Sequence, residues 1–397
     1  MALKFSLILF LVALVGSSLC NFEQVDGRRI LSKNEDLELE QQLRVLNKPA
    51  IKTIQDEGDL YDCIDINKQP ALDHPLLKDH KIQMKPTSRP KSLAIKSSQL
   101  RESTKALLRS IGCPEGTVPI QRTTKEDLRR AKSFRETHSL NFRLLATNSP
   151  SQHVAGVHST GAATYYGAQA NMNMINPKVT DDQSTLAAIT ISNKNHAILA
   201  GWAVSPSLYG DHNTHLITYW KGDINSGCYN LLCSAGFVLI ENHYGFQVKQ
   251  NTSTLDGIQQ EIQILIWHDN KTDNWWVSLP NDSTDHVIDI GYWPGSIVPG
   301  LSKGASSVSF GGLTQAPANE PSPPMGYGTF PSNNLKHCGY FAEMKTIDQN
   351  EYLTGLVGSW GEFTDSPNCY GAKYFGNEDG NGYVMEYGGP GGSNCAF

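Results

Sequence analysis

The C-terminal part of the chain alternates between apolar and polar positions with the period of two that a β-strand imposes. Residues 261–267 are the clearest example, because three isoleucines fall on one face while Glu261 and Gln263 fall on the other. Clusters of Gly, Asn and Asp separate this run from others of the same kind. These others are residues 186–192, 197–204, 215–220, 237–242, 287–293 and 306–311. So many short strands predict an all-β fold, an antiparallel β-sandwich of two packed sheets, rather than a parallel α/β fold.

The N-terminal part follows a different pattern, with few aromatic side chains and with helix signals rather than strand signals. Ser97–Arg109 places leucines on a helical stripe, and Thr123 with a glutamate three residues later has the form of a capping box. Residues 137–152 are rich in Ser and Asn, which is typical of a linker. We therefore expect a smaller mixed or helical segment at 21–149 and the sandwich domain at 150–397.

The first 20 residues have the three parts of a secretory signal peptide. Lys4 precedes the apolar run Phe5–Val15, and the small residues Ser18 and Cys20 occupy the positions before the cleavage site. The apolar run is much shorter than the roughly 20 residues that cross a bilayer, and no later stretch is long enough. We expect residues 1–20 to be removed and the product to have no transmembrane segment. It would be secreted to the extracellular space, or sent to the vacuole or cell wall through the secretory pathway.

Charge is divided unevenly along the chain. Residues 1–149 carry 24 basic and 18 acidic side chains, whereas residues 150–397 carry 9 basic and 21 acidic ones, and no arginine follows Arg143. A domain this acidic lacks the basic face that nucleic acid and anionic membranes require. We therefore expect no nucleic-acid partner. We also expect the basic N-terminal segment to be attracted to the acidic domain, less strongly as salt is added.

Seven cysteines remain after the signal peptide and would face an oxidising compartment. Cys228 and Cys233 bracket a short turn that a disulfide can close, and a zinc site there lacks a second pair of ligands at suitable spacing. The expected disulfides are Cys63–Cys113, Cys228–Cys233 and Cys369–Cys395, which leaves Cys338 without a partner. Sequons at Asn251, Asn270 and Asn281 predict N-glycosylation.

None of the common signatures of a nucleophilic or metal enzyme is present. The chain lacks a Gly-x-Ser-x-Gly elbow, a glycine-rich phosphate loop and a His-Glu-x-x-His zinc helix. The sequence therefore indicates neither a cofactor nor a metal. An acidic, aromatic-rich sandwich can instead work with paired carboxylates, of which one is ionised as a general base and the other protonated as a general acid.

A series of short motifs resembles the neprosin family, the secreted glutamic prolyl endopeptidases of plants. Residues 62–77, which read DCIDINKQPALDHPLL, resemble the activation peptide of that family. Further matches follow in family order, at residues 200–202 (AGW), 209–211 (YGD), 227–233 (GCYNLLC), 274–276 (NWW), 291–294 (GYWP), 325–328 (MGYG) and 387–391 (YGGPG). The resemblance implies a β-sandwich peptidase whose propeptide covers the cleft and is removed to activate it.

The same resemblance implies a catalytic pair of glutamates, and neither position carries one in this chain. The first glutamate of active members directly precedes the Ala-Gly-Trp motif, where this chain has Leu199. The second follows Gly-Gly in a Trp-Gly-Gly-Glu motif, where this chain has Leu313. No glutamate lies within two residues of either leucine, and leucine neither transfers a proton nor accepts a hydrogen bond. We therefore predict an apolar cleft without the acid–base pair.

Three other residues are candidates for lining this cleft. Ser307 and Ser309 share the face of Leu313 by period-two counting, which predicts a floor of small side chains. Trp202 is a candidate for ligand contact because it lies three residues beyond Leu199, although its parity places it on the opposite face.

Three functions are compatible with these features. The first is a non-catalytic relative that binds a proline-containing peptide or protein, or its own propeptide. The second is an active proline-specific endopeptidase that uses a displaced carboxylate. The acids considered for that role are Asp211, Asp289 and Glu320. The third is an extracellular structural glycoprotein that binds glycan through aromatic side chains. His212, His215 and His268 are interpreted as turn formers rather than as substitute catalysts.

Overall fold

The computed structural model describes eight stretches of the chain. They are residues 34–56, 58–92, 111–137, 152–223, 226–233, 236–241, 252–280 and 287–395. Contacts divide the chain into two compact units, Met1–Leu46 and Asn47–Phe397. In the first unit, residues 34–46 form an α-helix. The predicted signal peptide, the helix expected at 97–109 and most of the predicted linker lie outside the described residues.

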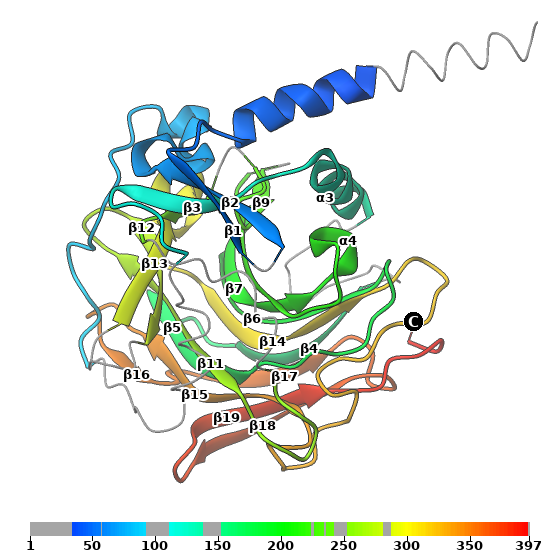
Figure 1. Cartoon of the computed structure of the whole chain (residues 1–397). Helices are drawn as coiled ribbons and strands as arrows, with labels where there is room; N and C mark the ends of the chain where they lie inside the picture. Colours follow the sequence, from blue (N-terminus) through cyan, green and yellow to red (C-terminus); the bar gives the residue numbers. More distant parts are fainter. Residues whose placement is uncertain are drawn as a thin grey trace, which may run out of the picture. The chain divides into compact units, whose positions relative to one another are not determined.

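The second unit begins with a small antiparallel sheet in the order β1-β2-β3 (Figure 1). Its strands are β1 (Lys52–Asp56), β2 (Asp59–Asp65) and β3 (Thr117–Gln121). The short 3-10 helices η1 (Ile66–Lys68), η2 (Pro70–Asp73) and η3 (Pro75–Leu77) follow β2. The N-terminal segment is thus mixed rather than purely helical. The sequence pattern missed β2 because Asp62 interrupts its apolar alternation, and this carboxylate is buried only because Arg122 and Thr53 bind it at 2.6 and 2.7 Å.

Helix α3 (Lys125–Thr137) confirms the second predicted helix, with a correction to its start. The backbone N–H of Thr124 donates to the Asp127 carboxylate at 2.7 Å, and the N–H of Asp127 donates to the Thr124 hydroxyl at 3.2 Å. This reciprocal pair is a capping box shifted by one residue from the predicted Thr123 box. An aspartate can close the box as well as the glutamate that the sequence pattern favoured.

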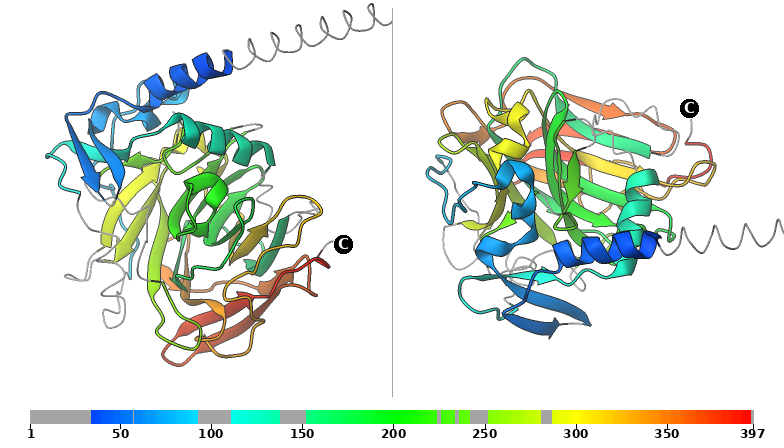
Figure 2. Two further views of the ribbon diagram at one scale, coloured as in Figure 1. Left: turned by 45° about the vertical axis from the view of Figure 1, so that its right-hand side comes forward. Right: turned by 90° about the horizontal axis from the view of Figure 1, so that it is seen from above.

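Two large antiparallel sheets form the rest of the unit (Figures 1 and 2), which confirms the predicted sandwich. The first sheet has the strand order β17-β4-β14-β6-β7-β8-β9. Its strands are β4 (Gln152–Ser159), β6 (Ser184–Asn193), β7 (His196–Val204), β8 (His215–Lys221), β9 (Gly227–Tyr229), β14 (Ser307–Gln315) and β17 (Trp360–Thr364). The short helix α4 (Pro206–Tyr209) connects β7 to β8, and η4 (Gly295–Ile297) and η5 (Pro299–Leu301) lie in the connection from the second sheet to β14.

The second sheet has the order β10-β13-β12-β11-β5-β15-β19-β18, with β16 paired to β15. Its strands are β5 (Gly167–Asn173), β10 (Val238–Leu239), β11 (Glu261–Asp269), β12 (Asn274–Pro280), β13 (Val287–Trp293), β15 (Gly339–Ile347), β16 (Leu353–Gly355), β18 (Gly371–Glu378) and β19 (Gly382–Gly388). Among the described residues, no helix is long and apolar enough to cross a membrane.

The main hydrophobic core includes the inner faces of both sheets. The isoleucine face of β11, at residues 262, 264 and 266, contributes to this core as the alternation predicts. Ile198, Ala200 and Trp202 contribute from β7, and Phe310 contributes from β14. Removal of these side chains from water is the main stabilising term of such a sandwich. The alternate residues of β7 and β14 consequently lie on the outer face of the first sheet.

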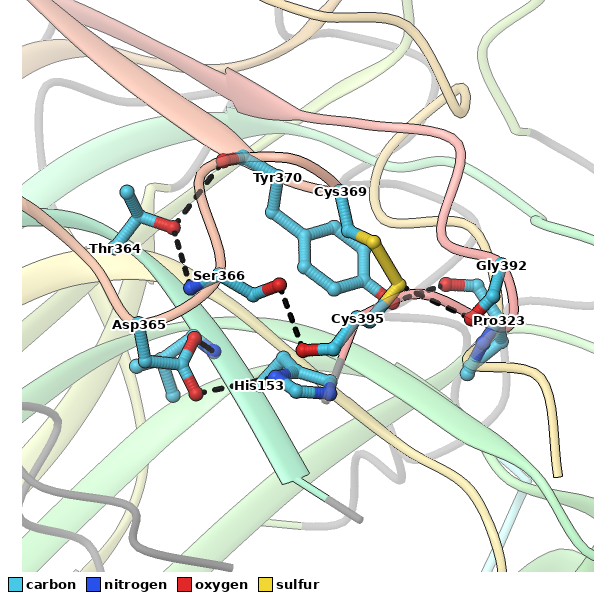
Figure 3. The surroundings of a disulfide bond; sticks show 10 residues. His153, Pro323, Thr364, Asp365, Ser366, Cys369, Tyr370, Gly392 and Cys395 are labelled. Carbon is cyan, nitrogen blue, oxygen red and sulfur yellow. Dashed lines mark hydrogen bonds and ion pairs between the residues drawn. A yellow bond between two sulfur atoms is a disulfide. The ribbon is translucent and has the colours of Figure 1, made fainter. Parts of the chain in front are cut away.

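The described residues contain the three expected disulfides, Cys63–Cys113, Cys228–Cys233 and Cys369–Cys395. The last of these ties the C-terminal segment to the β17–β18 connection (Figure 3). Nearby, the Ser366 hydroxyl donates to the Cys395 carbonyl at 2.8 Å, and the Tyr370 hydroxyl donates to the Pro323 carbonyl at 2.7 Å. The disulfide and the Ser366 bond hold Cys395 against the β17–β18 connection although it follows the last strand.

Candidate functional site

Leu199 and Leu313 lie on the same outer face of the first sheet. In the strand register Leu199 is opposite Thr190, which is opposite Ser309 on β14. Leu313 lies four residues beyond Ser309 on the same strand and therefore on the same face. Strand β6 separates the two leucines, which are 1% and 2% exposed. The two positions at which the resemblance implies glutamates thus share one face, separated by β6 and offset by four residues along the strands.

The floor between the two leucines is made of very small residues. Gly311, Ala188 and Gly201 are opposite one another on β14, β6 and β7, and Gly156 extends the row onto β4. A Cβ atom added at Gly201 would lie 1.9 Å from the Ala187 carbonyl oxygen, so no larger residue fits there. Ser307 and Ser309 predict such a floor from the sequence, and Ser307 is half-buried at the start of β14. Ser309 lies in the Leu199 row and is 5% exposed.

Apolar and aromatic side chains surround the leucines. We call this group the cleft cluster, and it consists of Val154, Leu186, Ala188, Ala197, Leu199, Ala203, Leu208, Ile217, Tyr219, Tyr229 and Leu313. Tyr209, Leu232 and Phe363 pack against it. Burial raises the pKa of the Tyr219 hydroxyl to about 12, so this phenol stays neutral. The tyrosines were not singled out by sequence reasoning, although Tyr209 and Tyr229 belong to motifs of the family.

Trp202 does not lie on the face of Leu199 and Leu313, which corrects its candidacy for ligand contact. Its side chain is fully buried in the core between the sheets, where its indole N–H donates to the Asn173 carbonyl at 2.9 Å. Three steps along a strand reverse the direction of the side chain, so Trp202 must face away from Leu199.

Asp211 lies in the loop between α4 and β8 and forms a pair with His215, the first residue of β8. The two side chains lie 2.7 Å apart, and the Tyr209 ring stacks on the imidazole at 4.0 Å. Burial raises the pKa of Asp211, but the His215 ring and the Asn213 N–H lower it by more, to about 2. Asp211 is therefore ionised even in moderate acid and cannot serve as the protonated member of an acid–base pair.

The other two acids considered as substitutes lie elsewhere. Asp289 belongs to β13 of the second sheet, where Arg89 binds it in a bidentate ion pair. Glu320 lies exposed in a loop after β14. His212 is at the surface near Asp181, and His268 belongs to β11 of the second sheet. None of these four residues approaches the leucines in the sheet register.

His158 is a titratable residue of this face that sequence reasoning missed. It lies opposite Ser309 on β4, and its ring contacts Phe363 edge-on at 5.3 Å. Burial lowers the pKa of this imidazole, so the ring is neutral near pH 7. Its Nδ1 atom is buried without a hydrogen-bond partner among the described residues.

The N-terminal segment contacts the same side of the sandwich. A pocket between the two is lined by Tyr61, Arg122 and Asp127 from one and by Tyr209, His215 and Leu232 from the other. Helix α3 packs on α4, and the Arg130 guanidinium fits against Gly210, where an added Cβ would lie 2.9 Å from its central carbon. Gly210 also has a φ of +79°, which favours glycine.

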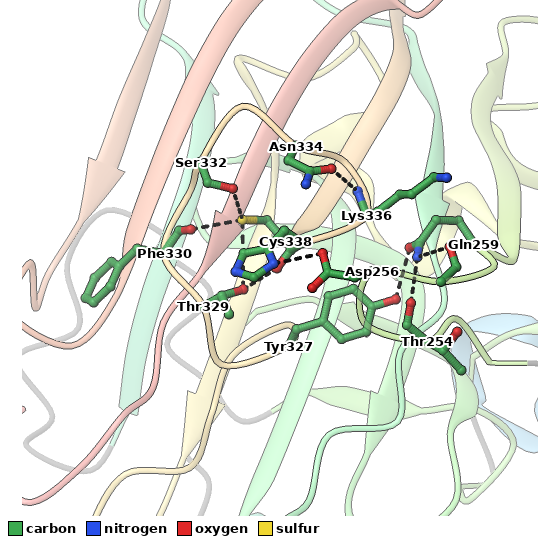
Figure 4. Close-up of polar contacts among 12 residues, drawn as sticks. Thr254, Asp256, Gln259, Tyr327, Thr329, Phe330, Ser332, Asn334, Lys336 and Cys338 are labelled. Atoms are coloured by element: carbon green, nitrogen blue, oxygen red, sulfur yellow. Dashed lines mark hydrogen bonds and ion pairs between the residues drawn. The ribbon is translucent and has the colours of Figure 1, made fainter.

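Cys338 is the one unpaired cysteine of the described residues, and it is fully buried (Figure 4). Its thiol donates to the Phe330 carbonyl at 2.9 Å and contacts the Ser332 hydroxyl at 3.5 Å. Burial raises the pKa of the thiol. A protonated, enclosed thiol is a structural group rather than a nucleophile.

Comparison with known proteins identifies two family models in this chain. The model described as Neprosin matches residues 181–390, more than half of the chain, and the model described as Neprosin activation peptide matches residues 51–165. Solved structures of scytalido-glutamic peptidase with transition-state analogues are similar at 10% identity and a TM-score of 0.34, over 60% of this chain and 97% of theirs. An eqolisin peptidase with the tripeptide Ala-Ile-His has the same identity and coverage at a TM-score of 0.33.

Proposed function

Because the chain belongs to the neprosin family, we propose that it is a peptidase-like protein that binds extended, proline-containing peptides in the cleft of the first sheet without hydrolysing them. The observation that carries this proposal is the replacement of both implied glutamates by leucines that share one buried apolar cluster. Its N-terminal segment acts as the propeptide, and residues 21–149 and 150–397 are the propeptide and the binding domain.

The chemistry of the cleft supports binding over hydrolysis. Peptide hydrolysis by a carboxylate pair needs one group to take a proton from water and another to protonate the leaving amine. Leu199 and Leu313 do neither. Asp211 is bound to His215 and stays ionised, and Asp289 is bound to Arg89 on the other sheet. These contacts argue against a displaced carboxylate as the catalyst.

The same cleft keeps features that suit a proline-rich ligand. Its floor of Gly156, Ala188, Gly201 and Gly311 lets a backbone approach closely. Tyrosine rings at its border offer flat apolar surfaces with a hydroxyl at the edge, and proline rings pack on such surfaces. An apolar floor flanked by aromatic side chains therefore favours an extended peptide over a charged ligand.

The cysteines and the glycosylation site support a secreted location. Three disulfides form readily in the oxidising secretory pathway and rarely in the cytosol. Asn270 is exposed on the turn between β11 and β12, so a glycan attached there would extend into solvent. Asn251 and Asn281 lie outside the described residues and stay predictions.

The test is digestion of a proline-rich peptide mixture by the acid-treated secreted protein, read by mass spectrometry. The natural protein should bind the peptides and leave them intact at every acidic pH. A Leu199→Glu/Leu313→Glu variant should gain cleavage, because the two positions then carry a carboxyl pair. A Leu199→Gln/Leu313→Gln variant is the matched control, since it has the same shape without ionisation.

Cleavage after proline by the natural protein would overturn the proposal. Absence of both cleavage and saturable peptide binding would overturn it as well, because binding is the function proposed. Thermal unfolding of each variant shows whether the polar side chains introduced at the two buried positions unfold the protein.

A further inference from the structure

The second sheet carries a row of aromatic residues on its outer face. Trp267, Trp276 and Tyr292 are opposite one another on β11, β12 and β13. The two indole rings stack at 6.1 Å, and the Trp276 and Tyr292 rings lie 4.8 Å apart. All three are at most 1% exposed. Something must cover them, because the outer face of a sheet otherwise meets water.

Residues 69–91 cover this row, and we call them the strap. Ala71, Leu72 and Ile82 of the strap belong to or pack against the apolar cluster of the row. Apolar contact alone would suffice to exclude water. The strap is nevertheless held by a set of directed polar contacts.

Two carboxylates at the border of the row bind the strap. Asp269, which is fully buried, accepts hydrogen bonds from the Gln83 amide at 2.8 Å, the Thr87 N–H at 2.7 Å and the Thr87 hydroxyl at 2.5 Å. Asp289, 8% exposed, takes both arms of the Arg89 guanidinium at 3.0 and 2.5 Å. The Ser278 hydroxyl also donates to Asp289 at 2.8 Å and fixes its orientation. A bidentate fork of this kind selects arginine over lysine.

The strap also bonds to backbone and phenol groups of the sheet. The Gln69 side-chain amide accepts from the Leu239 N–H and donates to the Leu239 carbonyl, both at 2.9 Å, as a neighbouring strand would. The Gln83 N–H donates to the Tyr292 hydroxyl at 2.9 Å. Lys91 pairs its backbone with residues 351–353 in a parallel bridge. Such bonds are the means by which sheets bind extended peptides.

We propose that the outer face of β10, β11, β12 and β13 is a peptide-binding surface in its own right, that it recognises an extended segment with an arginine between prolines, and that the strap is its built-in occupant. The strap reads Pro86-Thr87-Ser88-Arg89-Pro90 at the two carboxylates. Residues 81–90 form no helix, and their prolines favour an extended backbone. Departure of the strap would leave two carboxylates beside an open aromatic row, a combination complementary to a cationic, proline-flanked chain.

The site is distinct from the cleft, so a result that overturns one proposal does not overturn the other. The cleft belongs to the first sheet and is apolar, whereas this surface belongs to the second sheet and selects a cation. No residue is shared between the two sets of variants.

The experiment uses the full-length chain and a labelled peptide with the sequence of residues 80–92. The natural chain, whose strap competes, should bind it weakly. A strap variant, Arg89→Ala, weakens the internal competitor and should bind the natural peptide at least about tenfold more tightly. Adding Asp289→Asn to this variant should return the affinity to the natural level. A peptide in which the arginine is replaced by lysine should bind less well than the natural peptide, because lysine cannot form the fork.

A second strap variant, Thr87→Val, keeps the test valid if Arg89→Ala misfolds, because Thr87→Val loses only a hydroxyl that binds Asp269. Absence of saturable binding to both strap variants, at unchanged melting temperatures, would overturn the proposal. Equal binding of a scrambled peptide would overturn it too. Displacement of the peptide by a neutral glucose hexasaccharide would mean that the aromatic row recognises glycan instead of peptide.

Discussion

At the scale of single residues, the direction of a side chain decides its role. Leu199 and Trp202 are three residues apart on β7, and one faces the cleft while the other faces the core. Parity along the strand predicts this separation, and adjacency in sequence does not. The positions of Leu199 and Leu313 came from motifs around them, and their apolar side chains alone would have classed both as ordinary core residues.

The structural role of Trp202 can be tested against Trp293. Trp202→Phe removes apolar volume and leaves the Asn173 carbonyl without its donor, so the free energy of unfolding should fall by about 2 kcal/mol or more. Trp293 is equally buried, but its indole N–H has no partner among the described residues. Trp293→Phe should therefore cost about 1 kcal/mol less. Chemical denaturation measures both, and a loss of peptide binding by Trp202→Phe without a loss of stability would contradict a core role.

At the scale of elements, the strands with strong β-formers were predictable and those without were not. The pattern located β6, β7, β8 and β11 to within two or three residues. It missed β5, which reads GAQANMN and lacks β-branched or aromatic residues. This strand lies between β11 and β15, and an added Cβ at Gly167 would lie 2.5 Å from the Ile266 carbonyl. Close packing against its neighbours, which no local pattern encodes, makes it a strand.

The capping box of α3 provides a test at this scale. Thr124→Ala removes the hydroxyl that accepts from the Asp127 N–H, and should weaken the helix by about 1 kcal/mol. Thr123→Ala is the control, because only the backbone of Thr123 is bound, by Asn47. Amide hydrogen exchange in the first turn of α3 should quicken in the first variant and stay unchanged in the second. Equally faster exchange in both variants would contradict a cap formed by Thr124 rather than Thr123.

At the scale of the whole molecule, the uneven distribution of charge along the chain predicted attraction between the N-terminal segment and the acidic domain. It did not predict which residues make the contacts. The ion pair of Arg89 with Asp289 joins residues 200 positions apart, and the Thr87–Asp269 bonds span 182 positions. No local signal marks partners at such separations. The activation-peptide motif was recognisable at residues 62–77, whereas the polar contacts of the strap with β11 and β13 required the structure.

Acid should loosen the strap in two steps, because two kinds of titratable group hold it. Burial lowers the pKa of His80, whose ring bonds to the Tyr292 hydroxyl, so the docked state favours the neutral ring. The contribution of His80 to docking of the strap is lost as pH falls from the ordinary pKa of 6.5 towards the lowered pKa. Burial raises the pKa of Asp269, but the bonds from Thr87 and Gln83 lower it by more. The contribution of Asp269 to docking of the strap is present above the ordinary pKa of 3.8 and is lost as pH falls through the lowered pKa.

Hydrogen exchange of residues 80–91 between pH 7 and pH 2 measures both steps. His80→Gln should remove the first step, since glutamine does not titrate. Asp269→Asn should remove the part of the second step that Asp269 supplies, while weakening the strap at neutral pH. In the natural protein the strap should be held most firmly near neutrality and released in strong acid, whereas the cleft cluster contains no carboxylate or histidine that such acid would protonate. Protection that stays constant down to pH 2 would mean that the apolar contacts of Ala71, Leu72 and Ile82 hold the strap without help from either group.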